Sequence, residues 1–217
     1  YTQVTDLSGT VRYVTGGRVL GGRGTSDEGP ARRARLNFPS AVAVDRAGNL
    51  YIADTMNHRV RKVDAATGII TNVAGTGQAR YSGDDGPAVS AAINEPTGLA
   101  VSDEALYIAD QSNNRVRRVD LATGVITTVA GDGTAAYSGD QVSAVQASLA
   151  GPSGVALGGD GVVYVADTFN SRIRSVDPAT GQIATVAGDG GTYRYQGPAE
   201  PSSPSLSRPA GIAVGSD

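Results

Sequence analysis

A unit of 56 or 57 residues recurs along this chain of 217 residues, and this repetition constrains the fold more than any other feature. Each unit carries a proline before an apolar run, a tyrosine in the next run, an aspartate that ends it, and a glycine that closes a Val-Ala-Gly triplet. These markers are Pro39, Pro96, Pro152 and Pro209; Tyr51, Tyr107 and Tyr164; Asp54, Asp110 and Asp167; and Gly75, Gly131 and Gly188. A fixed period of this length indicates a repeat architecture in which each unit is one supersecondary element.

Within one unit the pattern is entirely β. The first unit predicts four short strands, at residues 40–44, 50–53, 59–63 and 69–73. The segments between the first two and between the last two have the Asp, Asn and Gly composition of tight turns. Helical periodicity is absent, so four antiparallel strands per unit predict an all-β fold, a β-propeller made of four-stranded blades.

Both ends of the chain hold parts of the same unit. Residues 10–14 align with a fourth strand, and residues 210–214 align with a first strand. We therefore expect a single propeller segment over residues 1–217, with full repeats at about 36–92, 93–148 and 149–205 and partial blades at 1–35 and 206–217. A closed ring needs at least four blades, so we expect the remaining blades from the same, longer chain or from a second copy.

Composition excludes several classes of function. The chain has no Cys, which excludes a disulfide framework, a Cys-ligated zinc site and a Cys nucleophile. Its 18 basic and 21 acidic residues give no basic surface for nucleic acid, and no apolar run is long enough to cross a bilayer. We expect no nucleic-acid partner and no membrane insertion. The single histidine, His58, is interpreted as a surface loop residue rather than a metal ligand or general base.

Three stretches resemble NHL repeats. They are Leu-Tyr-Ile-Ala-Asp54, Leu-Tyr-Ile-Ala-Asp110 and Val-Tyr-Val-Ala-Asp167, each followed by Asn-x-Arg-Val/Ile-Arg. The segment from Tyr81 to Ala88 is similar to the inter-blade segment of long bacterial NHL proteins and of teneurin-like surface proteins. The resemblance implies a propeller of usually six blades, of which this chain would hold three with one further strand at each end. It also implies a location outside the cell or at the cell surface.

The resemblance leaves several functions open. Members of the family serve as protein-binding surfaces, RNA binders and sensor domains, and relatives include lyases and lactonases with a metal in the central channel. We expect a non-catalytic binding or scaffold module without a cofactor, which contacts a protein or carbohydrate partner through its loop-rich face. The alternative is a segment of a metal-dependent lyase or lactonase whose ligands lie largely in the missing blades.

An Asp, Asn and Arg set recurs between the second and third strands of every unit. A carboxylate there can accept hydrogen bonds from loop amides and from a guanidinium at the base of the hairpin. Repetition in every unit favours a structural clamp over a ring of ligand-binding carboxylates. The predicted clamp residues are Asp54, Arg59, Asp110, Arg115, Asp167 and Arg172.

The loops between second and third strands differ from unit to unit, while the frame around them does not. In propellers these loops share a face with the long connections between units. Apolar side chains at loop tips are candidates for recognition, with packing onto a neighbouring loop as the alternative. The candidate binding residues are Met56, His58, Tyr81, Gln111, Tyr137, Phe169 and Arg194.

The remaining polar motifs favour ordinary structural roles. Asp84, Asp85 and Asp140 are weak calcium candidates in the connections, with Asp-stabilised turns as the alternative. In the Asp-x-Ala-Thr-Gly segments the Asp side chain caps a turn that the Gly ends, so a turn is favoured over a metal site. The basic cluster at residues 32–35 lies beside two acidic residues and lacks the aromatics that RNA recognition needs.

Overall fold

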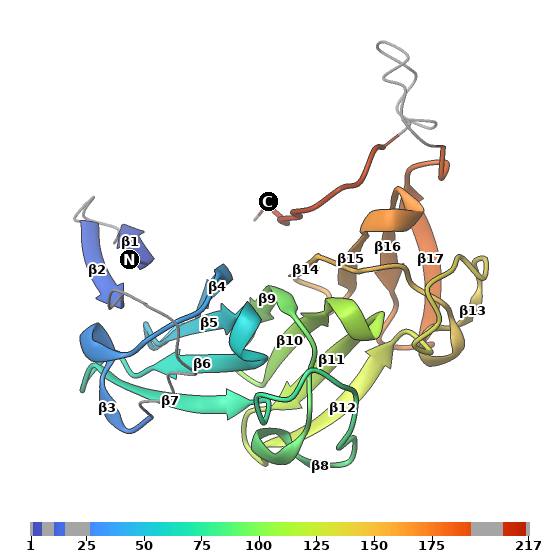
Figure 1. Ribbon diagram of the computed structural model, residues 1–217. Helices are drawn as coiled ribbons and strands as arrows, with labels where there is room; N and C mark the ends of the chain where they lie inside the picture. The colour runs from blue at the N-terminus through green and yellow to red at the C-terminus, as the bar shows by residue number, and fades with distance from the viewer. Residues whose placement is uncertain (1, 6–10, 16–26, 192–205, 216–217) are drawn as a thin grey trace.

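The computed structural model describes residues 2–5, 11–15, 27–191 and 206–215 (Figure 1). Three antiparallel sheets of five strands each stand side by side along an arc. The innermost strands of neighbouring sheets contact each other, β4 (Pro39–Val44) with β9 (Pro96–Val101) and β9 with β14 (Gly154–Leu157). The predicted all-β propeller fold is confirmed.

In each sheet the four main strands follow one another from the inside outward. After β4, the first sheet continues with β5 (Leu50–Asp54), β6 (Arg59–Val63) and β7 (Ile69–Ala74). The second continues from β9 with β10 (Ala105–Asp110), β11 (Arg115–Asp120) and β12 (Val125–Ala130). The third continues from β14 with β15 (Val163–Asp167), β16 (Arg172–Val176) and β17 (Gln182–Ala187).

Each sheet also has a fifth strand, of two residues, which the sequence pattern did not indicate. These strands are β3 (Gly29–Pro30), β8 (Gly86–Pro87) and β13 (Val142–Ser143), and each lies on the outer edge of the sheet that follows it in the chain. A 3-10 turn follows each of them: η1 (Ala31–Arg33), η3 (Ala88–Ser90) and η5 (Ala144–Gln146). The long connections therefore belong to the next sheet well before its innermost strand begins.

The N-terminal part contains a hairpin, whereas the sequence predicted one strand at residues 10–14. Its strands are β1 (Thr2–Thr5) and β2 (Val11–Thr15). β2 contacts η1 as β7 contacts η3 and β12 contacts η5. Its place is therefore that of a fourth strand, as predicted.

The C-terminal segment, residues 210–214, was predicted as a first strand but forms no strand. Its position is nevertheless the expected one. The carbonyl of Ala210 accepts a hydrogen bond from Ser153 (2.9 Å), as that of Thr97 does from Ser40 (3.2 Å). A first strand makes its ladder only with the second strand of its own sheet, and the described residues contain no second strand for this segment.

Apolar side chains fill the spaces between neighbouring sheets. Tyr51 and Val60 of the first sheet pack in one cluster with Leu106 and Ile108 of the second. An equivalent cluster joins the second sheet to the third. The face that each sheet turns toward the next one carries alanines, among them Ala53, Ala74, Ala109 and Ala130, and these small side chains let the sheets approach closely.

The glycine of each Val-Ala-Gly triplet is required by two constraints at once. Gly131 has φ +97°, and a Cβ on it would overlap the carbonyl oxygen of Asn114. Gly75 and Gly188 have the same conformation and lie against His58 and Ser171. The repeated glycine therefore marks a close approach between two loops rather than a functional site.

Candidate functional site

One face of the arc is formed by the loops between second and third strands. Each loop is a 3-10 turn: η2 (Thr55–Asn57), η4 (Gln111–Asn113) or η6 (Thr168–Asn170). Backbone hydrogen bonds join each turn to the segment that leads into the innermost strand of the same sheet, for example from Phe169 N to Ala150 O (3.0 Å). We call the surface made by these turns and by residues 37–39, 94–96 and 150–152 the loop face.

The loop face presents large apolar side chains on the first and third sheets. Met56 is 45% exposed and Phe38 is 76% exposed on the first sheet, and Phe169 is 58% exposed on the third. The Phe169 ring covers Gly151, where a Cβ would collide with it, and the guanidinium of Arg208 lies 5.5 Å from the ring centroid. Met56 and Phe169 therefore both lie on the surface, and their role in recognition stays a prediction.

The middle sheet is polar at the corresponding positions. Ser112 takes the place of Met56 and Phe169, and its hydroxyl donates a hydrogen bond to the carboxylate of Glu95 (2.6 Å). Gln111, a predicted binding residue, is half-buried at the start of η4, where the other two sheets have threonine. On the loop face, the turn tips of the first and third sheets are therefore apolar, and the turn tip of the second sheet between them is polar.

His58 joins the loops of neighbouring sheets. Its Nδ1 accepts a hydrogen bond from the backbone N–H of Glu95 (3.2 Å), and burial lowers the pKa of the imidazole. Asn114, which occupies the same left-handed position in the next sheet, accepts an equivalent bond from Gly151 N (2.9 Å). The half-buried His58 is therefore a neutral hydrogen-bond acceptor between two loops.

A hollow of about 570 Å³ opens beside η2 on this face. Met56 and His58 line it on one side and residues 76–79 on the other. The hydroxyl of Thr76 is buried there and has no hydrogen-bond partner among the described residues. No signal in the sequence marks Thr76, because this position has no common residue type in the repeats. The other two units have Asp132 and Asp189 there, whose carboxylates cap turns by accepting hydrogen bonds from Thr134 N and Gly191 N (2.7 Å each).

The predicted clamp exists, but its arginine is the second of each Arg-x-Arg pair. Asp110 accepts hydrogen bonds from Asn94 N (2.6 Å) and from Asn113 Nδ2 (2.9 Å), and Arg117 Nη1 lies 3.3 Å from it. Asp54 pairs in the same way with Arg61, and Asp167 with Arg174. All six of these side chains are completely buried.

The first arginines were expected on these carboxylates and are not there. Arg59, Arg115 and Arg172 stand at strand starts, where their guanidinium groups reach backbone carbonyls instead. Arg59, for example, donates to Gly75 O (3.1 Å) and Thr76 O (2.7 Å). They still fasten loops together, but through a different acceptor from the one expected.

A second carboxylate from the preceding connection completes each buried charge group. Arg117 Nη2 lies 2.5 Å from Asp84, and Arg174 Nη2 lies 2.9 Å from Asp140. Arg61 is paired with Asp27 in the same way. Asp84 and Asp140, two of the three calcium candidates, therefore bind arginine. The third, Asp85, is exposed and begins the pairing with β12.

In the second sheet, the two carboxylates of the buried charge group have opposite pKa shifts. Burial raises the pKa of Asp54 and Asp167, and it raises that of Asp110 to about 6. Burial also acts on Asp84, but hydrogen bonds from Thr128 and Tyr81 together with the charge of Arg117 outweigh it and lower its pKa. No group of three or more His, Cys, Asp or Glu side chains suited to a metal occurs in the described part of the chain.

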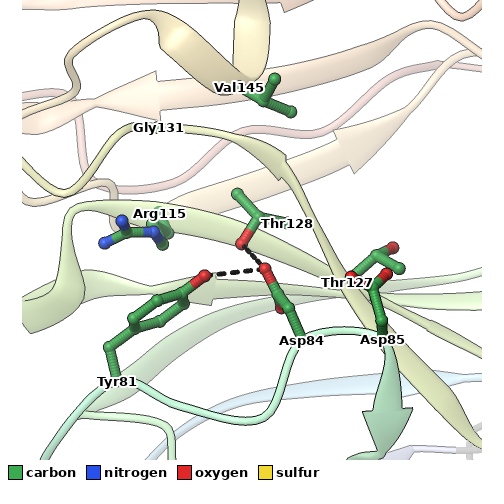
Figure 2. A pocket seen from close by; sticks show the side chains of 8 residues that line it. All are labelled: Tyr81, Asp84, Asp85, Arg115, Thr127, Thr128, Gly131 and Val145. Carbon is green, nitrogen blue, oxygen red and sulfur yellow. Dashed lines mark hydrogen bonds between the residues drawn. The ribbon is translucent and has the colours of Figure 1, made fainter.

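A second hollow, of about 290 Å³, lies at the outer rim between the second and third sheets (Figure 2). The Tyr81 ring stacks on the guanidinium of Arg115 (3.9 Å), and its hydroxyl donates to Asp84 (2.8 Å). Thr128 donates to the same carboxylate (2.6 Å). The hollow is lined by Tyr81, Asp84, Asp85, Arg115, Thr127, Thr128, Gly131 and Val145, and we call it the rim groove.

The predicted binding residues therefore separate into two groups. Met56, His58, Gln111 and Phe169 lie on the loop face. Tyr81 and Tyr137 lie at the outer rim, where Tyr137 stacks on Arg172 (3.9 Å). Arg194 lies outside the described residues. Among the described residues, Phe38 is the most exposed of the large apolar side chains. It was missed because only its left-handed position before a proline repeats, not its residue type.

Comparisons with known proteins agree with the repeat pattern. The NHL repeat family model matches residues 36–63 and 149–174. NHL repeat-containing protein 2 of Gallus gallus is 38% identical over 99 residues, which cover 45% of this chain and 13% of that protein. Teneurin-4 of Mus musculus is 33% identical over 165 residues, 66% of this chain and 6% of that protein. The chain thus spans only a small part of these relatives.

Solved structures share the fold. A Bacteroides thetaiotaomicron protein of unknown function superposes with a TM-score of 0.57 at 21% identity, covering 81% of this chain and 42% of that one. An auxiliary nutrient binding protein of Bacteroides ovatus gives 0.55 at 20% identity, covering 83% and 44%. Among the described residues, no helix has the length and apolar character needed to cross a membrane.

Proposed function

Because this chain belongs to the NHL-repeat family of β-propeller proteins, we propose that it is a non-catalytic binding module whose loop face contacts a protein partner. The observation that carries the proposal is the exposure of Met56 and Phe169 at equivalent loop tips, 45% and 58%. Large apolar side chains at rigid, exposed positions are the usual anchors of protein interfaces. Glu95 and Ser112 supply polar contacts between them.

The support beneath these loop tips favours recognition by a preformed surface. Asp54 and Asp167 lie directly before η2 and η6, and each accepts a hydrogen bond from the asparagine that ends the turn, Asn57 (2.9 Å) or Asn170 (2.8 Å). Each is also paired with a buried arginine. Turns held in this way lose little conformational entropy when a partner binds.

The titratable groups near this face support binding rather than catalysis. His58 uses Nδ1 as an acceptor for Glu95 N–H, so that nitrogen is already occupied. Asp110 has a raised pKa, but it is completely buried and is satisfied by Asn94, Asn113 and Arg117. A general base needs a free lone pair directed at its substrate.

The relatives support the same class of role. A solved propeller of similar fold is described as an auxiliary nutrient binding protein, and similarity to teneurin-4 extends over 66% of this chain. We propose a location outside the cell or at its surface. The remaining blades would come from the same, longer chain or from a second copy.

The test replaces both apolar tips at once, as Met56→Ser with Phe169→Ser. Wild type and variant are immobilised, and the proteins that each captures from the extracellular fraction of the source are quantified by mass spectrometry. We expect the variant to keep its melting transition and to lose specific captured proteins. A matched control is Val89→Ser with Val186→Ser, which alters two valines of similar exposure (49% and 55%) that belong neither to the turns nor to the segments that define the loop face. Equal losses in both variants, or no loss in the first, would contradict the proposal.

A further inference from the structure

The outer edge of β12 is only partly covered by its neighbour. β8 pairs with Val125 and Ile126 alone, and the last backbone bond of this ladder runs from Asp85 N to Ile126 O (2.8 Å). Among the described residues, no strand pairs with the outer edge of β12 beyond this point. The next backbone bond to a connection is that of Gly131 N to Ala144 O of η5 (2.9 Å), so the open part of the edge is the short stretch around Thr128. Since backbone groups of alternate residues point to the same side of a strand, Thr128 faces outward as Ile126 does.

The rim groove lies at this uncovered edge (Figure 2). Thr127 and Thr128 form its floor, and Val145 of the next sheet, 46% exposed, forms one wall. The opposite wall is Tyr81, whose ring is fixed by stacking on Arg115 and by its bond to Asp84. Both walls are therefore in place before a ligand arrives.

Two carboxylates line the groove, and one of them, Asp85, is paired with no arginine in the described part of the chain. Asp84 is paired with Arg117, whereas the exposed Asp85 stands at the end of the β8 ladder with φ +62°. In the third sheet Gln141 has the same place, the same conformation (φ +59°) and the same backbone bond, to Ile183 O (2.8 Å). The chain thus contains both an acidic and a neutral version of one site.

We propose that the rim groove binds a short, extended peptide segment that pairs with the edge of β12 at Thr128 and places a lysine or arginine beside Asp85. An open strand edge supplies backbone hydrogen bonds to an added strand, and the groove walls select its side chains. Val145 would contact an apolar side chain next to the basic one. This site is separate from the loop face and does not depend on its function.

The experiment is a titration of the full, ¹⁵N-labelled chain with the end-capped peptide Val-Lys-Val-Lys-Val, followed by NMR. We expect amide shifts at residues 127–131 and at Val145, and slower hydrogen exchange at Thr128 N–H. The same peptide with its central residue N-methylated lacks a ladder donor and should not bind. The peptide with glutamate in place of lysine should bind about threefold to fivefold more weakly.

The variant Asp85→Gln reproduces the third sheet's version of the groove and should weaken binding of the lysine peptide by about the same factor. Glu104→Gln, which neutralises an exposed carboxylate between β9 and β10 that does not line the groove, should not. The loop-face variant Met56→Ser/Phe169→Ser should also bind the peptide normally. Shifts elsewhere on the chain, no shifts at millimolar peptide, or equal binding of the N-methylated peptide would overturn the proposal.

Discussion

The guanidinium of Arg117 and the carboxylate of Asp110 lie 3.3 Å apart and are both completely buried in the second sheet. The first and third sheets contain the same pair, Arg61 with Asp54 and Arg174 with Asp167. Burial of two charges is costly unless each finds further partners. Here the loop amides supply them for the aspartate, and a second aspartate supplies one for the arginine.

Replacement of this aspartate should strongly destabilise the fold. We expect Asp110→Ala to lower the free energy of unfolding by about 3 kcal/mol, because it leaves a buried guanidinium with one carboxylate fewer. Asp103→Ala is the matched control, since Asp103 pairs with Arg46 (2.8 Å) at the exposed surface. It should cost less than about 1 kcal/mol. Denaturant unfolding measures both, and equal effects would refute a structural role for the buried pair.

The raised pKa of Asp110, about 6, predicts a specific pH dependence. Between the unfolded pKa near 4 and this value the folded state binds more protons, so the contribution of Asp110 to stability falls as pH rises through this range. Relative to Asp110→Asn, the wild type should therefore lose stability from pH 4 to pH 7. Unfolding measured for both proteins at several pH values checks this, and a difference that grows with pH would show the opposite linkage.

The glycines of the Val-Ala-Gly triplets should tolerate no side chain. Gly131→Ala should destabilise the protein by more than about 2 kcal/mol, because its positive φ is strained for alanine and its Cβ would overlap Asn114 O. Gly124→Ala is a control with a similar φ, +72°, but open space around it. It should cost about 1 kcal/mol. A comparison of the two melting transitions separates the collision from the backbone strain.

A threonine hydroxyl at the start of the 3-10 turn connects the first sheet to the second, and another connects the third sheet to the C-terminal segment. Thr55 Oγ1 donates to Pro96 O (2.8 Å), and Thr168 Oγ1 donates to Pro209 O (2.8 Å). The second sheet has Gln111 at this position.

Thr97, at the position of Ser40 and Ser153, has a buried hydroxyl that is unpaired among the described residues. We expect the double change Thr97→Ser with Gln111→Thr to stabilise the protein by about 1 kcal/mol by adding the missing hydrogen bonds. Thr97→Ser with Gln111→Val, which lacks the new hydroxyl, is the control. A stability equal to that of the control would show that the bonds do not form.

Local sequence determined the repeat, its strands and its turns. The Asp-x-Ala-Thr-Gly segments form the predicted turns: Asp64 accepts hydrogen bonds from Ala66 N (3.1 Å) and Thr67 N (2.8 Å), and Gly68 has φ +69°. These features depend on residues within a few positions of one another. For the same reason the exposure of Met56 and Phe169 at turn tips was predictable.

Only the tertiary structure decided which charges meet. Asp110 contacts Arg117 and not Arg115, its partner in the strand register. The second carboxylate that binds Arg117, that of Asp84, lies 33 residues earlier in the chain than Arg117. The rim groove likewise forms because β8 joins the following sheet and stops after two residues. The course of a long connection depends on how whole sheets pack against each other, and no short-range pattern in the sequence encodes that packing.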